Sequence, residues 1–136
     1  MRMLVAICLP LASAALGGCR PSGPPAIAGV EWTLVELAGR PAATGSGAQP
    51  ATLRLAPDGP RAAGFAGCNH LAGTYRLSGD SLVFRPLIPT KMACSTEMDL
   101  EQAYLDALAA TRTYRTAAGR LELAGERGVL ARFESR

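Results

Sequence analysis

Short stretches in which apolar and polar residues alternate make up most of the chain after residue 30. In residues 52–55 two leucines alternate with polar residues, and Val129, Ala131 and Phe133 share one face of an extended chain. Alternation with a period of two is typical of strands that turn one face to a core. The pattern predicts strands at residues 31–37, 52–55, 62–67, 74–77, 82–84, 113–117, 120–123 and 129–133. Val35 breaks the alternation of the first strand, which predicts a β-bulge there.

One segment has helical spacing instead. Its apolar residues at i, i+3, i+4, i+7 and i+8 are Leu100, Ala103, Tyr104, Ala107 and Leu108. Thr96, followed three residues later by Asp99, fits a helix start in which both side chains cap the first turn. We therefore predict one amphipathic helix over residues 96–110, whose apolar stripe faces the core. Together these elements predict a fold that is mainly β with one helix, a small antiparallel barrel-like or sandwich domain. The helix is inserted before the last strands and covers an open end.

The first 18 residues have the layout of an export signal. Arg2 is followed by an apolar run over residues 3–16, shorter than the roughly 20 residues that span a bilayer. The sequence LGGC at residues 16–19 resembles the lipobox of bacterial lipoproteins, in which the cysteine is lipidated and becomes the new N-terminus. We therefore predict a signal peptide over residues 1–18 and a lipid on Cys19. The alternative is an ordinary secretory signal followed by an accidental cysteine.

The residues after the signal predict a tether and one domain. Residues 19–29 are rich in proline and glycine and are predicted to form a lipidated tether, and residues 30–136 have the size of a single domain. Arg20 stands where many lipoproteins that stay in the inner membrane have an aspartate. By that resemblance we expect an outer membrane lipoprotein that faces the periplasm and contacts the membrane through its N-terminal lipid.

Charge narrows the choice of partner. The 14 basic and 11 acidic residues are interspersed and give a formal net charge of +3, which argues against a nucleic-acid partner. We expect Arg112, Arg115 and Arg120 to form a solvated face, and residues 39–50 to form a flexible loop. We also expect a monomer.

Three motifs together are specific for one family. They are GFAGCN at residues 64–69, GTY at 73–75 and TKMAC at 90–94. In this order they resemble the META domain, also called the HslJ-like family. The motif residues are Gly67, Asn69, Gly73, Tyr75, Thr90 and Met92. The resemblance implies a barrel-like β fold with one helix, frequent in envelope lipoproteins, with some members linked to heat shock and the stress response. It implies no established set of catalytic residues.

The residue types in the motifs also predict structural roles for these positions. We expect the glycines to permit tight bends and close backbone approach, and Asn69 to hold a turn by bonding to nearby backbone. We expect Met92 to lie in the core. Once Cys8 is removed with the signal and Cys19 is lipidated, Cys68 and Cys94 are the remaining thiols. In an oxidising compartment we expect them to form a disulfide that contributes ~3 kcal/mol to the stability of the fold. The alternative is that both cysteines are reduced and buried.

Two kinds of chemistry remain as alternatives for the same residues. His70 is the only histidine and lies two residues after Cys68, so a cysteine hydrolase could use the pair. Zinc could bind Cys68, His70 and Cys94, but a fourth ligand is missing. We favour neither and expect no catalytic residue, no metal and no cofactor.

The sequence predicts a lipid-anchored, non-enzymatic cell-envelope domain that acts as a binding or stress-tolerance module. A small apolar ligand could enter the barrel end between a rim loop at residues 68–73 and residues 39–50. The alternatives are a protein-interaction module, as an inhibitor or assembly partner of an envelope protein, and less favoured the hydrolase. A cavity inside the barrel would favour the ligand, and a solid core would favour the protein partner.

Overall fold

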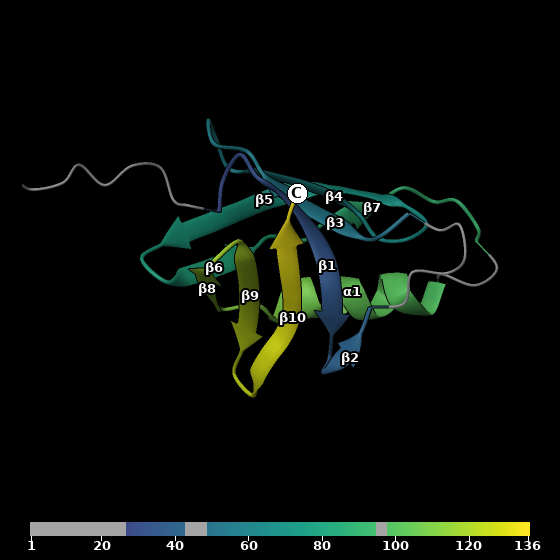
Figure 1. Cartoon of the computed structure of the whole chain (residues 1–136). Coiled ribbons are helices and arrows are strands. Elements are labelled where there is room, and N and C mark those ends of the chain that lie inside the picture. The colour runs from purple at the N-terminus through teal and green to yellow at the C-terminus, as the bar shows by residue number, and fades with distance from the viewer. Residues whose placement is uncertain (1–26, 43–48, 95–97) are drawn as a thin grey trace, which may run out of the picture.

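Eight strands form a closed antiparallel barrel, with one helix lying against it (Figure 1). The computed structural model describes residues 27–42, 49–94 and 98–136. The barrel strands are β1 (Glu31–Leu37), β3 (Thr52–Leu55), β4 (Arg61–Phe65), β5 (His70–Ser78), β6 (Ser81–Phe84), β8 (Thr113–Ala117), β9 (Arg120–Gly125) and β10 (Gly128–Ser135). Neighbours in this order pair antiparallel, and β10 pairs back onto β1, which closes the barrel. The predicted fold class is confirmed.

The strand predictions are correct along most of the barrel and wrong at the start of β5. The bounds of β3 and β8 match the prediction, and the bulge in β1 lies between Leu34 and Glu36 as expected. The predicted rim loop at residues 68–73 is wrong, because β5 begins at His70. Two strands were not predicted: β2 (Arg40–Pro41) pairs with β1, and β7 (Ile88–Pro89) pairs with β5. β2 lies in the segment expected to be an unstructured loop.

Side chains fill the interior of the barrel. The buried side chains include Trp32, Leu34, Leu53, Leu55, Leu82, Tyr104, Leu108, Leu121, Leu123 and Phe133. The Tyr104 ring lies 6.1 Å from that of Phe133, and its hydroxyl donates to the Thr52 carbonyl at 3.0 Å. Burial raises the pKa of Tyr104 well above its ordinary value. The barrel is therefore a packed core in which even the large polar side chain has a partner.

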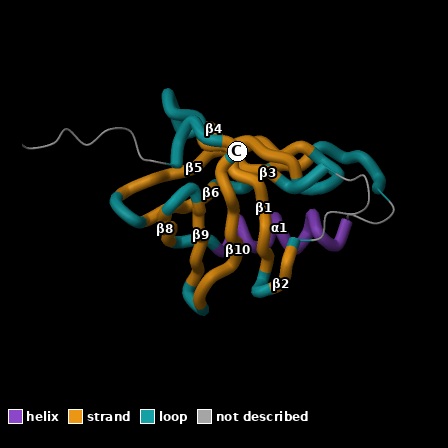
Figure 2. The backbone as a smooth tube through the Cα atoms, viewed as in Figure 1, coloured by secondary structure: helices purple, strands orange, loops and turns teal. Residues whose placement is uncertain are grey.

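The helix α1 (Met98–Ala110) ends where the sequence predicts, and packs against β1, β6, β9 and β10. Figure 2 shows it crossing behind β1 and β10. The predicted cap Thr96 lies outside the described residues. Tyr104, Ala107 and Leu108 are buried as expected, but Ala103 is exposed. Glu101, which was not predicted to face the core, is buried instead. It lies three residues before Tyr104 on the same helical face.

The domain begins before the predicted boundary at residue 30. Ile27 is fully buried, and its carbonyl accepts a hydrogen bond from the Trp32 indole at 3.0 Å. Gly29 donates its backbone N–H to the Leu55 carbonyl at 2.8 Å. Residues 27–29, which the predicted tether includes, therefore pack on the barrel. The predicted signal peptide and Cys19 lie outside the described residues. Within the described ranges, no helix has the length and apolarity to cross a membrane.

Candidate functional site

Asn69 is the centre of a buried hydrogen-bond network that joins three parts of the chain. Its side-chain oxygen accepts hydrogen bonds from the Met92 backbone N–H at 2.8 Å and from the Thr90 hydroxyl at 2.9 Å. Its amide nitrogen donates to the Met92 carbonyl at 3.1 Å and to the carboxylate of Glu101 at 3.0 Å. Asn69 does bond to backbone, but to that of Met92, 23 residues away in the sequence, so the expectation that it holds a local turn is wrong. The hydrogen bonds of Asn69 connect the start of β5 to residues 90–92 and to the helix α1.

Glu101 is the buried residue that the sequence analysis missed. Its side chain is 5% exposed, and it also accepts a hydrogen bond from the Asn69 backbone N–H at 3.1 Å. A buried carboxylate is costly unless hydrogen bonds satisfy it, and here Asn69 supplies those bonds. The sequence did contain a signal that Glu101 faces the core. Glu101, Tyr104 and Leu108 have the spacing i, i+3 and i+7 of one helix face.

Cys68 and Cys94 lie at disulfide distance, with Cα atoms 6.0 Å apart. That separation lies within the range that disulfides require. Asn69 holds the backbone of Met92, and the disulfide fixes Cys94 two residues later. The hydrogen bonds and the disulfide therefore hold the same segment of the chain. The structure agrees with the predicted pairing.

His70 does not join the cysteines in a catalytic or metal-binding group. It is exposed on the outer face of β5, and its ring lies 5.2 Å from the Phe65 ring. The sulfur of Cys68 is buried and at bonding distance from Cys94. Among the described residues, no cluster of three or more His, Cys, Asp or Glu side chains could hold a metal ion. The geometry therefore supports neither the hydrolase nor the zinc alternative.

The remaining motif residues shape the same corner. Gly67 has a φ of 95°, which a residue with a side chain rarely adopts. A Cβ at Gly73 would lie 2.9 Å from the Pro86 carbonyl oxygen, so this glycine permits close backbone approach. The Tyr75 hydroxyl donates to the Ala56 carbonyl at 2.7 Å; partial burial, with a smaller effect of the Asp58 charge, raises its pKa. The motif thus builds the barrel corner.

Met92 is the exception, because its side chain is 59% exposed. The expectation that it lies in the core is wrong. Both its backbone N–H and its carbonyl bond to the Asn69 side chain. The network thus uses the backbone at this position and leaves the thioether at the surface.

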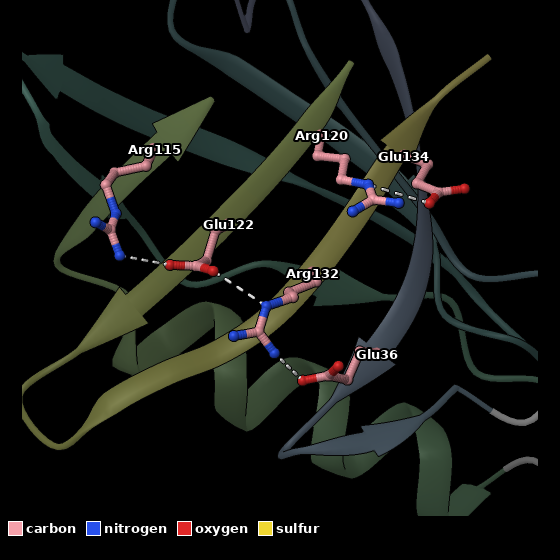
Figure 3. Close-up of polar contacts among 6 residues, drawn as sticks. All are labelled: Glu36, Arg115, Arg120, Glu122, Arg132 and Glu134. Atoms are coloured by element: carbon pink, nitrogen blue, oxygen red, sulfur yellow. Dashed lines mark hydrogen bonds and ion pairs between the residues drawn. The ribbon is translucent and has the colours of Figure 1, made fainter. Parts of the chain in front are cut away.

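The candidate functional site is a groove on the outer face of β1, β8, β9 and β10, with a volume of about 560 Å³. We call it the charged groove; its charged lining residues are Glu36, Arg115, Arg120, Glu122, Arg132 and Glu134. Figure 3 shows a row of alternating charges across the four strands, in which Arg132 bonds to Glu122 on one side and to Glu36 on the other. Arg115 extends the row from Glu122 at 3.0 Å. Arg120 and Glu134 form a second pair at 3.5 Å.

The charged groove has a defined electrostatic state. A hydrogen bond from Arg115, together with bonds and charge from Arg132, lowers the pKa of Glu122 from its ordinary value of 4.5 although burial opposes this. The hydrogen bond to Glu122 raises the pKa of Arg132 further above its ordinary range, with the charge of Glu36 adding to the effect. Glu122 and Arg132 are therefore both charged at neutral pH.

The expected arginine face is confirmed only in part. Arg115 and Arg120 are exposed and line the charged groove, but each has a glutamate partner. Arg112 lies elsewhere and donates to the carbonyls of Ala109 and Thr111. The sequence held a signal for the groove, because Arg120 and Glu122 in one strand face outward opposite Glu134 and Arg132 in the next.

Comparisons with known proteins agree with the fold and the motifs. The sequence model of the META domain matches residues 25–136. A protein from Burkholderia xenovorans, whose structure was determined by NMR, is 30% identical and has a TM-score of 0.64, with coverage of 91% of this chain and 95% of that one. A DUF4847 family protein from Bacteroides vulgatus ATCC 8482 is 18% identical, with a TM-score of 0.58 and coverage of 80% and 94%. The search of curated proteins found no match. The chain belongs to the META domain family.

Proposed function

We propose that this protein is a lipid-anchored, non-enzymatic domain of the cell envelope that binds a protein partner through the charged groove. The observation that carries the proposal is the packed interior of the barrel. A small apolar ligand inside the barrel would have to displace buried side chains such as Tyr104 and Leu108. A partner protein needs only the outer face.

The charged groove suits a protein partner. Its six charged residues sit on strands of a closed barrel, so their positions change little when a partner binds. Alternating charges impose one orientation on a partner with the complementary pattern, and repel others. Arg115 and Arg120 have side chains 83% and 76% exposed, so they are free to exchange their glutamates for groups of the partner.

Two further arguments support the other parts of the proposal. The pairing of Cys68 with Cys94 leaves no free thiol among the described residues for a nucleophilic mechanism, which favours a binding role. The LGGC sequence at residues 16–19 favours lipidation of Cys19, which would hold the domain at a membrane through buried acyl chains worth ~0.8 kcal/mol per methylene.

Photo-crosslinking in intact cells tests the partner. A photoreactive residue at Thr116, which lines the charged groove, should give a discrete crosslinked product, whereas one at Arg61, outside the groove, should not. The product at residue 116 should disappear when Arg115 and Arg120 are both replaced by glutamate. Identical products from both positions, or a product that survives the charge reversal, would contradict the assigned surface.

Detergent phase separation and intact mass test the anchor. The mature protein should enter the detergent phase and carry the mass of a lipid, and Cys19→Ser should do neither. Equal partitioning of the two proteins would contradict the anchor while leaving the charged groove untouched.

A further inference from the structure

A second hollow lies on the outer face of β1, β3, β4 and β5, with a volume of about 490 Å³. We call it the arginine hollow; the residues that carry the argument are Glu31, Arg54, Ala63, Phe65, His70 and Arg136. Strand pairing places them in order, since Arg54 lies opposite both Glu31 and Ala63, and Phe65 lies opposite His70. The small side chain of Ala63, between the larger Arg54 and the Phe65–His70 rings, leaves the space open.

The charges of the arginine hollow differ from those of the charged groove. In the charged groove every charged lining residue has an opposite partner. In the described part of the chain, no ion pair involves Arg54, Arg136 or Glu31. A ligand of the charged groove must compete with existing pairs, whereas an anion in the arginine hollow meets guanidinium groups without a carboxylate partner.

The hollow also has an aromatic wall. The rings of Phe65 and His70 lie 5.2 Å apart with an interplanar angle of 57°. His70 is exposed and Phe65 is half-buried, and rings at this separation can accept the edge or face of a third ring. The side chains of the two arginines and one glutamate in the lining carry a net charge of +1.

We propose that the arginine hollow binds a small aromatic monocarboxylate. The planar guanidinium of Arg54 matches a carboxylate through two parallel hydrogen bonds, and the ring of the ligand packs against Phe65 and His70. Glu31 disfavours ligands of higher negative charge. This site goes beyond the protein-binding role of the charged groove and does not depend on it.

NMR titration at pH 7.5 tests the site with three probes: 3-phenylpropanoate, the neutral 3-phenylpropanol and propanoate. For the first we expect saturable shifts of the backbone amides of Phe65, His70 and Ala63, with a Kd in the millimolar range that about eleven heavy atoms support. The alcohol lacks the charge and propanoate lacks the ring, so each should bind at least ~10-fold more weakly, a loss typical of one removed contact.

Matched arginine variants assign the contact. Arg54→Gln should raise the Kd for 3-phenylpropanoate at least ~10-fold, the equivalent of one charge-assisted bond. Arg61→Gln, an exposed arginine in β4 outside the hollow, should leave the Kd unchanged. The proposal is overturned if shifts do not saturate by about 20 mM, well above a millimolar Kd. It is also overturned if the alcohol binds as tightly, or if the two variants weaken binding alike.

Discussion

The link between Asn69 and Glu101 should hold the motif corner together, and replacing Asn69 with alanine should show this. The change removes bonds to the Thr90 hydroxyl, to both backbone groups of Met92 and to the Glu101 carboxylate. Three neutral bonds are worth ~1 kcal/mol each, and the bond to a charged group ~1.5–3 kcal/mol. The expected loss is therefore about 5 kcal/mol, a large part of the ~5–15 kcal/mol that stabilises a typical domain.

Urea unfolding monitored by the fluorescence of Trp32 measures the loss. Trp32 is the only tryptophan and is 3% exposed, so its emission reports the opening of the core. Gln102→Ala is the control, because its amide bonds to Asp106 at 2.9 Å on the exposed side of the same helix. We expect the control to cost less than about 0.5 kcal/mol.

A charge swap keeps the test informative if Asn69→Ala does not fold. Asn69→Asp alone places a second carboxylate against Glu101 and removes the donor, so it should destabilise strongly. Adding Glu101→Gln restores a donor and an acceptor with the charge exchanged, and should recover at least about 2 kcal/mol in a double-mutant cycle. A loss below about 1 kcal/mol for Asn69→Ala, or independent effects of the two changes in the cycle, would refute the reasoning.

Three other perturbations have definite outcomes. An alkylating reagent should add two groups to Cys68 and Cys94, as measured by intact mass, only after their disulfide has been reduced. That reduction should lower the free energy of unfolding by about 3 kcal/mol. Gly73→Ala should cost about 1–3 kcal/mol in urea unfolding, because the new Cβ meets the Pro86 carbonyl, whereas Gly59→Ala meets nothing within 4 Å and should be near neutral. The lowered pKa of Glu122 stabilises the fold above its ordinary value of 4.5, and this contribution disappears as the pH falls through the folded pKa. The stability difference between the native protein and Glu122→Gln should therefore narrow in acid.

Local pattern was enough to predict many of the strands, because barrel strands such as β1, β3, β6 and β9 bury alternate residues. The bulge at Val35 could be predicted for the same reason. β2 and β7 contain two residues each, too few for a period to be detected. The early start of β5 was missed because Gly67 and Asn69 look like turn residues, although only Gly67 has a positive φ.

The Asn69–Glu101 bond could not be predicted from local pattern, since 32 residues separate its partners. Only the carboxylate on the apolar face of the helix pointed to it. Met92 was misassigned for a related reason. Its apolar side chain suggested burial, whereas what the fold uses at that position is the backbone, held by Asn69.

These contacts separate the scaffold from the binding surfaces. The family motif supplies Asn69 and Thr90 to a network that holds one corner of the barrel, and Gly67 and Gly73 to bends beside it. None of these four residues lines the charged groove or the arginine hollow. The charged groove is built from residues outside the motif, so it can change without loss of the fold. Membership of the family therefore predicts the barrel, and the partner must be sought through the charges that this particular chain displays on its outer faces.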